Sequence, residues 1–197
     1  MILNVGTRSV LFGVHCFFIH PFVLAIAWWK LFGFPWDPRL WACFFLHDVG
    51  YLGKPNMDGP EGEQHPYLGA RIAGWLFGQE WYWFSLLHSR YLAKKLVRQP
   101  SKLALADKLV IAIEPSWLYL PRAIASGEIE DYRLQALKAN PAKESGDAAD
   151  ALRQIKQGGM MRDWRLWHRG LRRYMAIWVE RHKDGQVDLM TSSSRGN

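Results

Sequence analysis

The sequence has few cysteines and few charged residues for its length. Two cysteines among 197 residues, Cys16 and Cys43, cannot build a disulfide framework or a four-thiolate zinc site. Both lie in apolar runs, which favours the reducing cytoplasm as the compartment of this protein. Charged residues make up 22% of the chain and hydrophobic residues 49%, so the composition excludes global disorder and predicts a well-filled core.

The start of the chain also lacks charge. Residues 9–29 contain no Asp, Glu, Lys or Arg, and a run of this length is long enough to be weighed as a membrane span of about 20 residues. It contains His15, His20 and Pro21, however, and it lacks the positive cluster and the small-residue cleavage site of a secretory signal. We therefore favour a pair of buried core helices over a membrane segment.

Helical signals occur along the whole chain. Nothing repeats at a fixed period and no strand-like alternation lasts for more than a few residues, so the sequence predicts an all-α protein. Pro21 and Pro38 are typical of the first turn of a helix, and residues 50–65 are rich enough in Gly, Pro, Asn and Asp to form a loop. The helices that we expect cover residues 7–19, 21–32, 38–48, 66–77, 80–95, 101–113, 116–139 and 148–184, the last of them broken at Gly158 and Gly159.

A chain of 197 residues lies within the usual size of one domain. We expect a single compact helical bundle with extra C-terminal helices. Residues 1–139 form its main helical domain, and residues 140–190 form a helical extension packed on it, entered through a polar linker at 140–147. The tail, residues 191–197, is predicted to be disordered.

Positive charge exceeds negative charge. The chain has 25 Lys and Arg against 18 Asp and Glu, a net charge of +7, which favours a polyanionic partner such as a phosphate, a nucleotide, a nucleic acid or an anionic membrane. Residues 160–183 alternate Trp and Tyr with six arginines, a pattern also found in nucleic-acid and membrane binding. We favour the simpler interpretation, in which the aromatic rings pack on the domain and the arginines face water, so neither nucleic acid nor membrane is the favoured partner.

Histidine and aspartate form the pattern that points to chemistry. His47 and Asp48 are adjacent at the end of an apolar helix, and His65, His88 and Asp107 follow. Neutral imidazoles and carboxylates in this mixture suit two first-row transition-metal ions. Burying so many titratable groups without a common partner is unfavourable. The sequence therefore predicts a metal site.

The sequence motifs around these residues resemble those of a known family. HDVGY, HPYLGARIA, LLHSRY and SKLALADKLVIAIEP follow one another between about residues 10 and 120. Together they resemble the HD-domain superfamily of metal-dependent phosphohydrolases, in its six-ligand, two-metal branch. The last motif is most similar to bacterial dinucleoside tetraphosphate hydrolases. The resemblance implies an HD-type metal-binding fold for residues 1–139.

The resemblance also implies a ligand set, with a first histidine that is either His15 or His20. Five residues apart on one helix, these two would point about 140° apart, so only one of them binds metal. We favour His15, because His20 looks like a cap before Pro21. The remaining ligands are His47, Asp48, His65, His88 and Asp107.

Asp48 is the natural bridge and the catalytic residue of this set, because the two oxygens of a carboxylate can hold two cations about 3.5 to 4 Å apart. The first histidine, His47 and Asp107 would serve one ion, and His65 and His88 would complete the other. Iron is the first expectation for the metal and manganese the second, with magnesium, cobalt or nickel as alternatives.

Such a centre fits hydrolysis of a phosphoester or phosphoanhydride bond in a nucleotide or nucleotide polyphosphate. A water between two cations loses its proton near neutral pH and becomes the nucleophile. Many HD proteins carry a lysine three residues after the paired aspartate, where this chain has Tyr51. The candidates for binding the substrate phosphates are Lys54, Arg90 and Lys94, and Glu61 and Glu63 either donate a proton to the leaving group or keep the loop soluble.

Two other functions use the same residues. Some six-ligand HD proteins hold a mixed-valent diiron pair that activates dioxygen and cleaves a C–C or C–P bond. A non-catalytic nucleotide-binding or membrane-associated module is the other alternative. The likeness of the Asp107 segment to tetraphosphate hydrolases and the positive charge of the chain favour hydrolysis.

Overall fold

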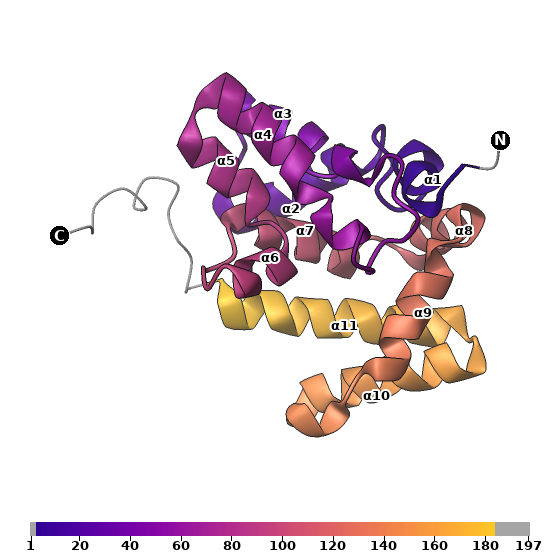
Figure 1. Ribbon diagram of the computed structural model, residues 1–197. Coiled ribbons are helices and arrows are strands. Elements are labelled where there is room, and N and C mark those ends of the chain that lie inside the picture. The colour runs from indigo at the N-terminus through magenta and orange to yellow at the C-terminus, as the bar shows by residue number, and fades with distance from the viewer. Residues whose placement is uncertain (1–2, 184–197) are drawn as a thin grey trace.

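The computed structural model describes residues 3–183, and in this part of the chain it contains eleven α-helices, three short 3₁₀ turns and no β-strand (Figure 1). The all-α prediction is therefore confirmed. The first half consists of α1 (Val5–Phe12), α2 (His20–Phe32), α3 (Pro38–Leu46), η1 (Val49–Tyr51), η2 (Gly62–Gln64), α4 (Pro66–Phe77), α5 (Gln79–Leu86) and α6 (Arg90–Lys95). The second half consists of α7 (Lys102–Ile113), α8 (Ser116–Ser126), α9 (Glu128–Lys138), η3 (Pro141–Lys143), α10 (Gly146–Met161) and α11 (Trp164–His182).

Prolines lie in the first turn of three helices, and two of them, Pro21 and Pro38, were predicted there. Pro38 is the first residue of α3, and the side chain of Asp37 accepts a hydrogen bond from the Arg39 amide at 2.9 Å. Pro21 lies in the first turn of α2. Pro66 begins α4 directly after His65, so the loop of residues 50–65 ends where a helix begins.

The predicted helix over residues 7–19 is wrong in its second half. Helix α1 ends at Phe12, and the chain then turns until α2 begins at His20. The amide of Val14 donates to the buried carboxylate of Glu128 at 2.6 Å, a contact that a continued helix would not allow. His15 and His20 therefore do not share one helix.

Two further predicted helices are divided. The segment 116–139 forms α8 and α9, because Gly127 takes a left-handed conformation with φ of +83° and ends α8. The segment 80–95 forms α5 and α6, with His88 in the break between them and the Ser89 hydroxyl accepting from the Leu92 amide at 3.2 Å.

The break between the last two helices is also placed differently from the prediction. Gly158 and Gly159 lie inside α10, and the chain turns at Arg162 and Asp163. A side chain at Gly158 would overlap the backbone of Trp167, so glycine here lets α10 and α11 pack closely. The predicted linker at 140–147 contains η3 and the start of α10, and the predicted disordered tail, 191–197, lies outside the described residues.

Two apolar clusters form most of the core. The first lies among α2, α3, α4, α5 and α7 and includes Leu24, Trp28 and Phe44. The second lies among α8, α9, α10 and α11 and centres on Trp167. Helix α11 runs along α7, and α9 crosses from α8 toward α10 (Figure 1). The C-terminal helices thus lie against the half of the molecule that carries the histidines.

The aromatic and basic residues of α11 are separated by burial. Trp167 is buried, whereas Arg165, Arg169 and Arg173 are exposed. This confirms the interpretation that the rings of this segment pack on the protein while most of its arginines face water. Within residues 3–183, none of the helices combines the length and the apolar character that a bilayer crossing requires.

Candidate metal centre

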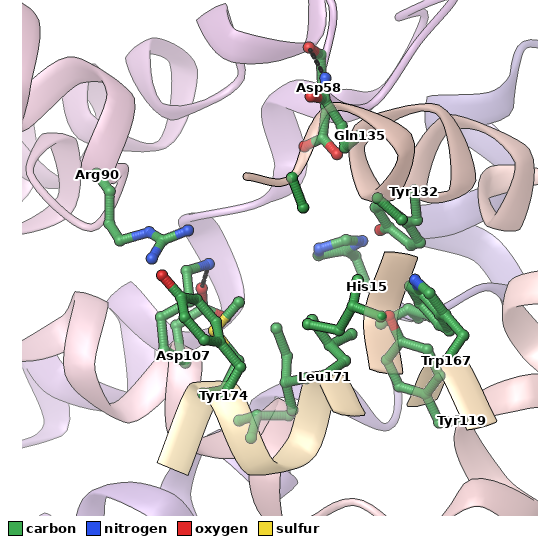
Figure 2. Close-up of a pocket in the computed structure, with 18 of the residues that line it drawn as sticks. His15, Asp58, Arg90, Asp107, Tyr119, Tyr132, Gln135, Trp167, Leu171 and Tyr174 are labelled. Carbon is green, nitrogen blue, oxygen red and sulfur yellow. Dashed lines mark hydrogen bonds and ion pairs between the residues drawn. The ribbon is translucent and has the colours of Figure 1, made fainter. Parts of the chain in front are cut away.

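The histidines and aspartates of the sequence pattern meet at one end of a large cavity. This cavity has a volume of about 410 Å³ and lies between the first half of the chain and helices α7 to α11 (Figure 2). His20 and Asp107 line it, and Arg90 and Lys108 lie at the same end.

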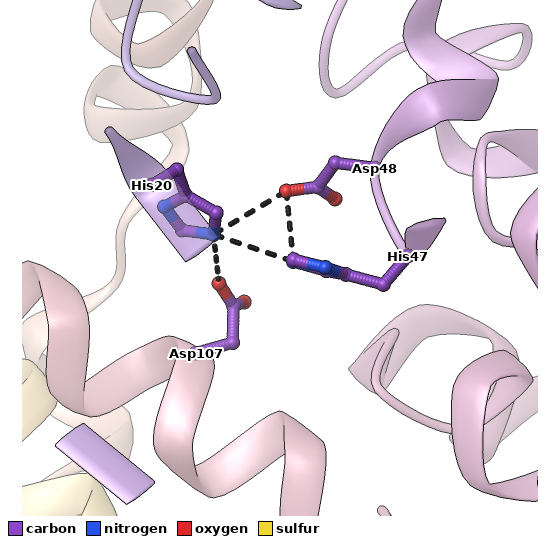
Figure 3. A group of neighbouring side chains, drawn as sticks. All are labelled: His20, His47, Asp48 and Asp107. Carbon is purple, nitrogen blue, oxygen red and sulfur yellow. Dashed lines mark hydrogen bonds and ion pairs between the residues drawn. The ribbon is translucent and has the colours of Figure 1, made fainter. Parts of the chain in front are cut away.

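One buried group consists of His20, His47, Asp48 and Asp107 (Figure 3). The Nε2 atom of His20 lies 3.3 Å from Asp107 Oδ1, 3.4 Å from Asp48 Oδ2 and 3.3 Å from His47 Nε2. His47 Nε2 lies 2.9 Å from Asp48 Oδ2. Residues from α2, from the end of α3 and from the middle of α7 thus direct four ligand atoms at one point.

A second buried group shares Asp48 with the first. His65 Nε2 and His88 Nε2 lie 3.0 Å apart, and they lie 3.4 and 3.6 Å from Asp48 Oδ1. Asp48 therefore presents Oδ2 to the first group and Oδ1 to the second. This is the arrangement that a carboxylate needs to bridge two cations.

Hydrogen bonds to the backbone fix which nitrogen faces the centre. The Nδ1 atoms of His47, His65 and His88 lie 3.0, 2.8 and 2.5 Å from the carbonyl oxygens three residues earlier. Because a carbonyl can only accept, each Nδ1 carries the hydrogen, and in the neutral ring each Nε2 keeps its lone pair. Lone pairs facing each other at 3.0 Å repel unless a positive charge lies between them, so the tautomers fit a bound metal ion.

Two buried polar atoms also lack a hydrogen-bond partner at this place. They are His20 Nδ1 and Asp48 Oδ2. Asp48 Oδ2 receives no hydrogen from His47, whose hydrogen is held by the Phe44 carbonyl. An unsatisfied buried acceptor costs about 1 to 3 kcal/mol, and a shared cation removes that penalty. The two groups could therefore hold metal ions.

The electrostatics of the centre keep both aspartates ionised and His65 neutral, whereas Asp48 raises the pKa of His47 against the effect of burial. Burial opposes ionisation of Asp48, but His47 and His15 outweigh it and hold the pKa of Asp48 well below its usual range. Burial opposes ionisation of Asp107 in the same way, and Lys108 and His20 hold its pKa well below the usual range too. Burial and the neighbouring His88 keep the pKa of His65 far below that of a free imidazole.

The loop after Asp48 brings His65 to the second group. A side chain at Gly50 would overlap the carbonyl oxygen of His65, so glycine permits this approach. Tyr51 stacks on the His65 ring with centroids 3.8 Å apart and an angle of 13°. The ring of Tyr51 therefore helps to orient the His65 imidazole.

His15 lies outside both groups, which corrects our preference for it as the first ligand. Its Nδ1 lies 2.8 Å from the hydroxyl of Ser9, and that hydroxyl donates to Glu128 at 2.7 Å. His20 takes the place in the group because α2 begins at this residue and its side chain caps nothing. Burial alone would lower the pKa of His15, but Asp48 and Glu128 raise it to about 9.

A smaller cavity of about 200 Å³ lies directly over both groups, lined by Asp48, His65 and His88. Arg90 and Lys108 contribute positive charge to this cavity, and Asp58 and Glu63 contribute carboxyl groups. Burial, reinforced by Asp58, raises the pKa of Glu63 to about 7.

Of the three predicted phosphate-binding residues, only Arg90 reaches the cavities. Lys54 and Lys94 line neither of them, and Lys94 is exposed. Lys108 was not predicted, although it directly follows Asp107 in the sequence, and its Nζ lies 2.7 Å from Asp107 Oδ2. Glu61 is exposed and binds the side chain of Asn56 at 2.6 Å instead of facing the centre.

Glu128 is the other buried group that sequence reasoning missed. It accepts hydrogen bonds from Ser9, Ser126 and Tyr132 at 2.7 to 2.9 Å, as well as from the Val14 amide. A single glutamate in an ordinary helical segment gives no signal of this role. Its contacts hold the turn that carries His15 and leads to His20.

No family model, no curated protein and no solved structure matches the chain in comparisons with known proteins. What the site can do therefore follows from its own geometry. That geometry consists of two buried groups of histidine and aspartate side chains that could hold metal ions and that share one carboxylate.

Proposed function

We propose that this protein is a metal-dependent phosphohydrolase, which cleaves a phosphoester or phosphoanhydride bond of a small phosphorylated compound such as a nucleotide. The observation that carries the proposal is the position of Asp48, with one oxygen directed at each of two histidine-rich groups. The resemblance of the sequence motifs to the HD-domain superfamily also supports metal-dependent phosphate hydrolysis.

Six side chains would hold two ions: His20, His47 and Asp107 on one side of Asp48, and His65 and His88 on the other. Bound there, a pair of divalent cations lowers the pKa of a water molecule and neutralises charge on phosphoryl oxygens. Iron is our first expectation and manganese our second, because imidazole and carboxylate ligands suit both.

Arg90 and Lys108 bind the phosphate in this proposal. Both line the small cavity over the two groups. A guanidinium can donate two parallel hydrogen bonds to phosphate oxygens, and an ammonium adds a compact point charge. They orient the phosphorus atom toward Asp48 and its neighbours.

Hydrolysis then requires one bond to form and one to break. The oxygen of a water molecule bonds to phosphorus, the bond from phosphorus to the leaving oxygen breaks, and that oxygen takes up a proton. Asp58 and Glu63 line the same cavity and can hold that proton on a carboxyl oxygen. Asp48 contributes by position alone, because both of its oxygens face the ligand groups.

The test begins with elemental analysis of the purified protein, followed by assays of phosphate release from nucleotides with iron or manganese, with and without dioxygen. We expect about two ions per chain and phosphate release under strict anaerobiosis. Asp48→Ala should lose both ions and all turnover while its circular dichroism stays helical, and Asp150→Ala, at an exposed ion pair, serves as the control.

Two results would overturn the proposal. Full metal content and turnover in Asp48→Ala would exclude the shared carboxylate. Turnover that requires dioxygen and breaks a C–C or C–P bond would assign the centre to oxygenase chemistry instead.

A further inference from the structure

The large cavity extends well beyond the phosphate-binding groups. It begins at Arg90 and Asp107 and continues to side chains of α9, α10 and α11, including Tyr132 and Trp167 (Figure 2). Its volume of about 410 Å³ lies in the range of pockets that bind small organic molecules. A phosphate bound in the smaller cavity, where we propose it, would not fill this space.

Charge is divided along this cavity. Arg90, Lys108, Asp58 and Glu63 line both this cavity and the smaller one over the metal centre, and so does His15, whose ring points into the large cavity (Figure 2). The lining contributed by α9, α10 and α11 carries no charged side chain among the described residues. Burying an unpaired charge there would be unfavourable, so this part of the cavity, which we call the inner chamber, suits an uncharged group.

Aromatic side chains form much of the inner chamber. Tyr132 and Trp167 line it, with Tyr119 of α8 beside them in the same cavity, and the rings of Tyr132 and Trp167 lie at 10° to each other with centroids 6.2 Å apart. The Tyr132 hydroxyl is already bound to Glu128 at 2.9 Å, so this phenol is held in place. Rigid aromatic walls interact best with a flat ring, whose binding requires little loss of internal freedom.

The polar groups of the inner chamber are few. Gln135 donates through Nε2 to the Asp58 carbonyl oxygen at 3.2 Å, which leaves its amide oxygen as an acceptor. Tyr174 lies toward Arg90 at the border with the charged end (Figure 2). A ring with a few polar atoms therefore fits this chamber better than a highly polar group.

We propose that α9, α10 and α11 form a binding site for one uncharged, ring-bearing organic group of a phosphate ester, whose phosphate lies at Arg90 and Lys108. This inference rests on the proposed function and names its substrate class.

Binding of phosphonates to the metal-loaded protein tests the chamber without any turnover. Phenylphosphonate, methylphosphonate and hexylphosphonate carry the same charged group with a ring, a single carbon and a flexible chain. Under anaerobic calorimetry we expect phenylphosphonate to bind about tenfold more tightly than methylphosphonate, and more tightly than hexylphosphonate.

Leu171 is the position for variants, since it lines the inner chamber from α11 (Figure 2). Leu171→Trp should fill the space and abolish the preference for phenylphosphonate while methylphosphonate binding is unchanged. Leu171→Phe is the milder version if the first variant does not fold. Leu166→Trp, on the same helix but outside the cavity, is the matched control and should keep the preference.

Equal affinities for phenylphosphonate and methylphosphonate would refute the proposal that the inner chamber binds an organic group. Equal or tighter binding of hexylphosphonate would overturn its assignment to rings. A preference for phenylphosphonate without phosphate release from any ester would refute the proposed function but support the inner chamber as a binding site for a ring. Phosphate release without any preference would refute only the chamber.

Discussion

The guanidinium of Arg90 lies over the indole ring of Trp178, with 5.0 Å between Cζ and the ring centroid. Arg90 begins α6 and lines both cavities, whereas Trp178 belongs to α11, near the end of the described chain. A cation and an aromatic face at this distance attract each other. Helix α11 therefore holds in place a positive charge beside the candidate metal centre.

Trp178→Leu should weaken substrate binding without changing metal content. Loss of a partly buried cation–π contact corresponds to about 1 kcal/mol, or about a fivefold rise in KM. Steady-state kinetics and elemental analysis measure both effects. Trp117→Leu, which changes a tryptophan that is 75% exposed on α8, should leave KM unaltered. An equal rise in both variants would count against the contact.

Arg90→Met and Lys94→Met should separate a cavity residue from a surface residue on the same helix. Arg90→Met removes charged hydrogen bonds to phosphate and should raise KM about tenfold or more. Lys94→Met should have no effect, because Lys94 is exposed and lines neither cavity. Calorimetry with inorganic phosphate provides a second measurement. A larger rise in KM for Lys94→Met than for Arg90→Met would indicate that Lys94, and not Arg90, binds the phosphate.

The two metal positions should be separable by mutation. His88→Ala removes one of three side chains of the second group and leaves the first group complete, so metal content should fall to about one ion per chain. Asp107→Ala affects only the first group and should also leave about one ion. Elemental analysis measures the content. Loss of both ions in each variant would show that the groups do not bind independently.

Gly50→Ala should displace His65. The added methyl group overlaps the carbonyl oxygen of His65, so the backbone must shift at a cost of about 1 to 3 kcal/mol. We expect a lower melting temperature and selective loss of the ion bound by His65 and His88. Val49→Ala, at the neighbouring position, adds no atoms and should keep both ions. A fully loaded Gly50→Ala protein would contradict this account of the loop.

Stability should fall between pH 6.5 and pH 4 because of His168. Burial and the nearby Arg172 lower its pKa to about 4, against 6.5 for a free histidine. Above pH 6.5 the ring is neutral in both states. Below it the unfolded chain takes up a proton that the folded protein excludes, so the free energy of unfolding falls by up to about 3 kcal/mol as the pH approaches 4.

Urea unfolding of His168→Gln at pH 7.5 and pH 4 measures this contribution against other titrating groups. The variant should lose less stability than the wild type over this range. His168 Nδ1 also shares a hydrogen bond with the Ser116 hydroxyl at 2.8 Å, and its ring stacks on Tyr119. The variant loses these contacts and is therefore expected to be less stable at pH 7.5. Identical pH slopes would show that His168 titrates normally in the folded protein.

Local signals were enough to predict much of the helical framework. Pro38 begins α3 because its ring fits a first turn and Asp37 caps it, and this information lies within a few residues. The end of α1 could not be predicted in this way. It depends on Glu128, which lies more than a hundred residues later in the chain. The carboxylate of Glu128 accepts a hydrogen bond from the Val14 amide in the turn after α1.

The candidate site shows the same division. The adjacency of His47 and Asp48 pointed to the centre, and the structure brings His65, His88 and Asp107 to it. The choice between His15 and His20 could not be made from spacing, because it required the position of a helix end. Lys94 was predicted from its spacing to His88 and Arg90, but it is exposed in the six-residue helix α6, and Lys108 was not considered.

His47, His65 and His88 each hold a backbone carbonyl through Nδ1 and direct Nε2 to the centre. Cysteine or aspartate at these positions would supply a donor atom for a transition metal but no second N–H. Such replacements would strip the carbonyls of Phe44, Gly62 and Ser85 of that partner. At these three positions only an imidazole, with its two ring nitrogens, can donate to the carbonyl and offer a lone pair to the centre.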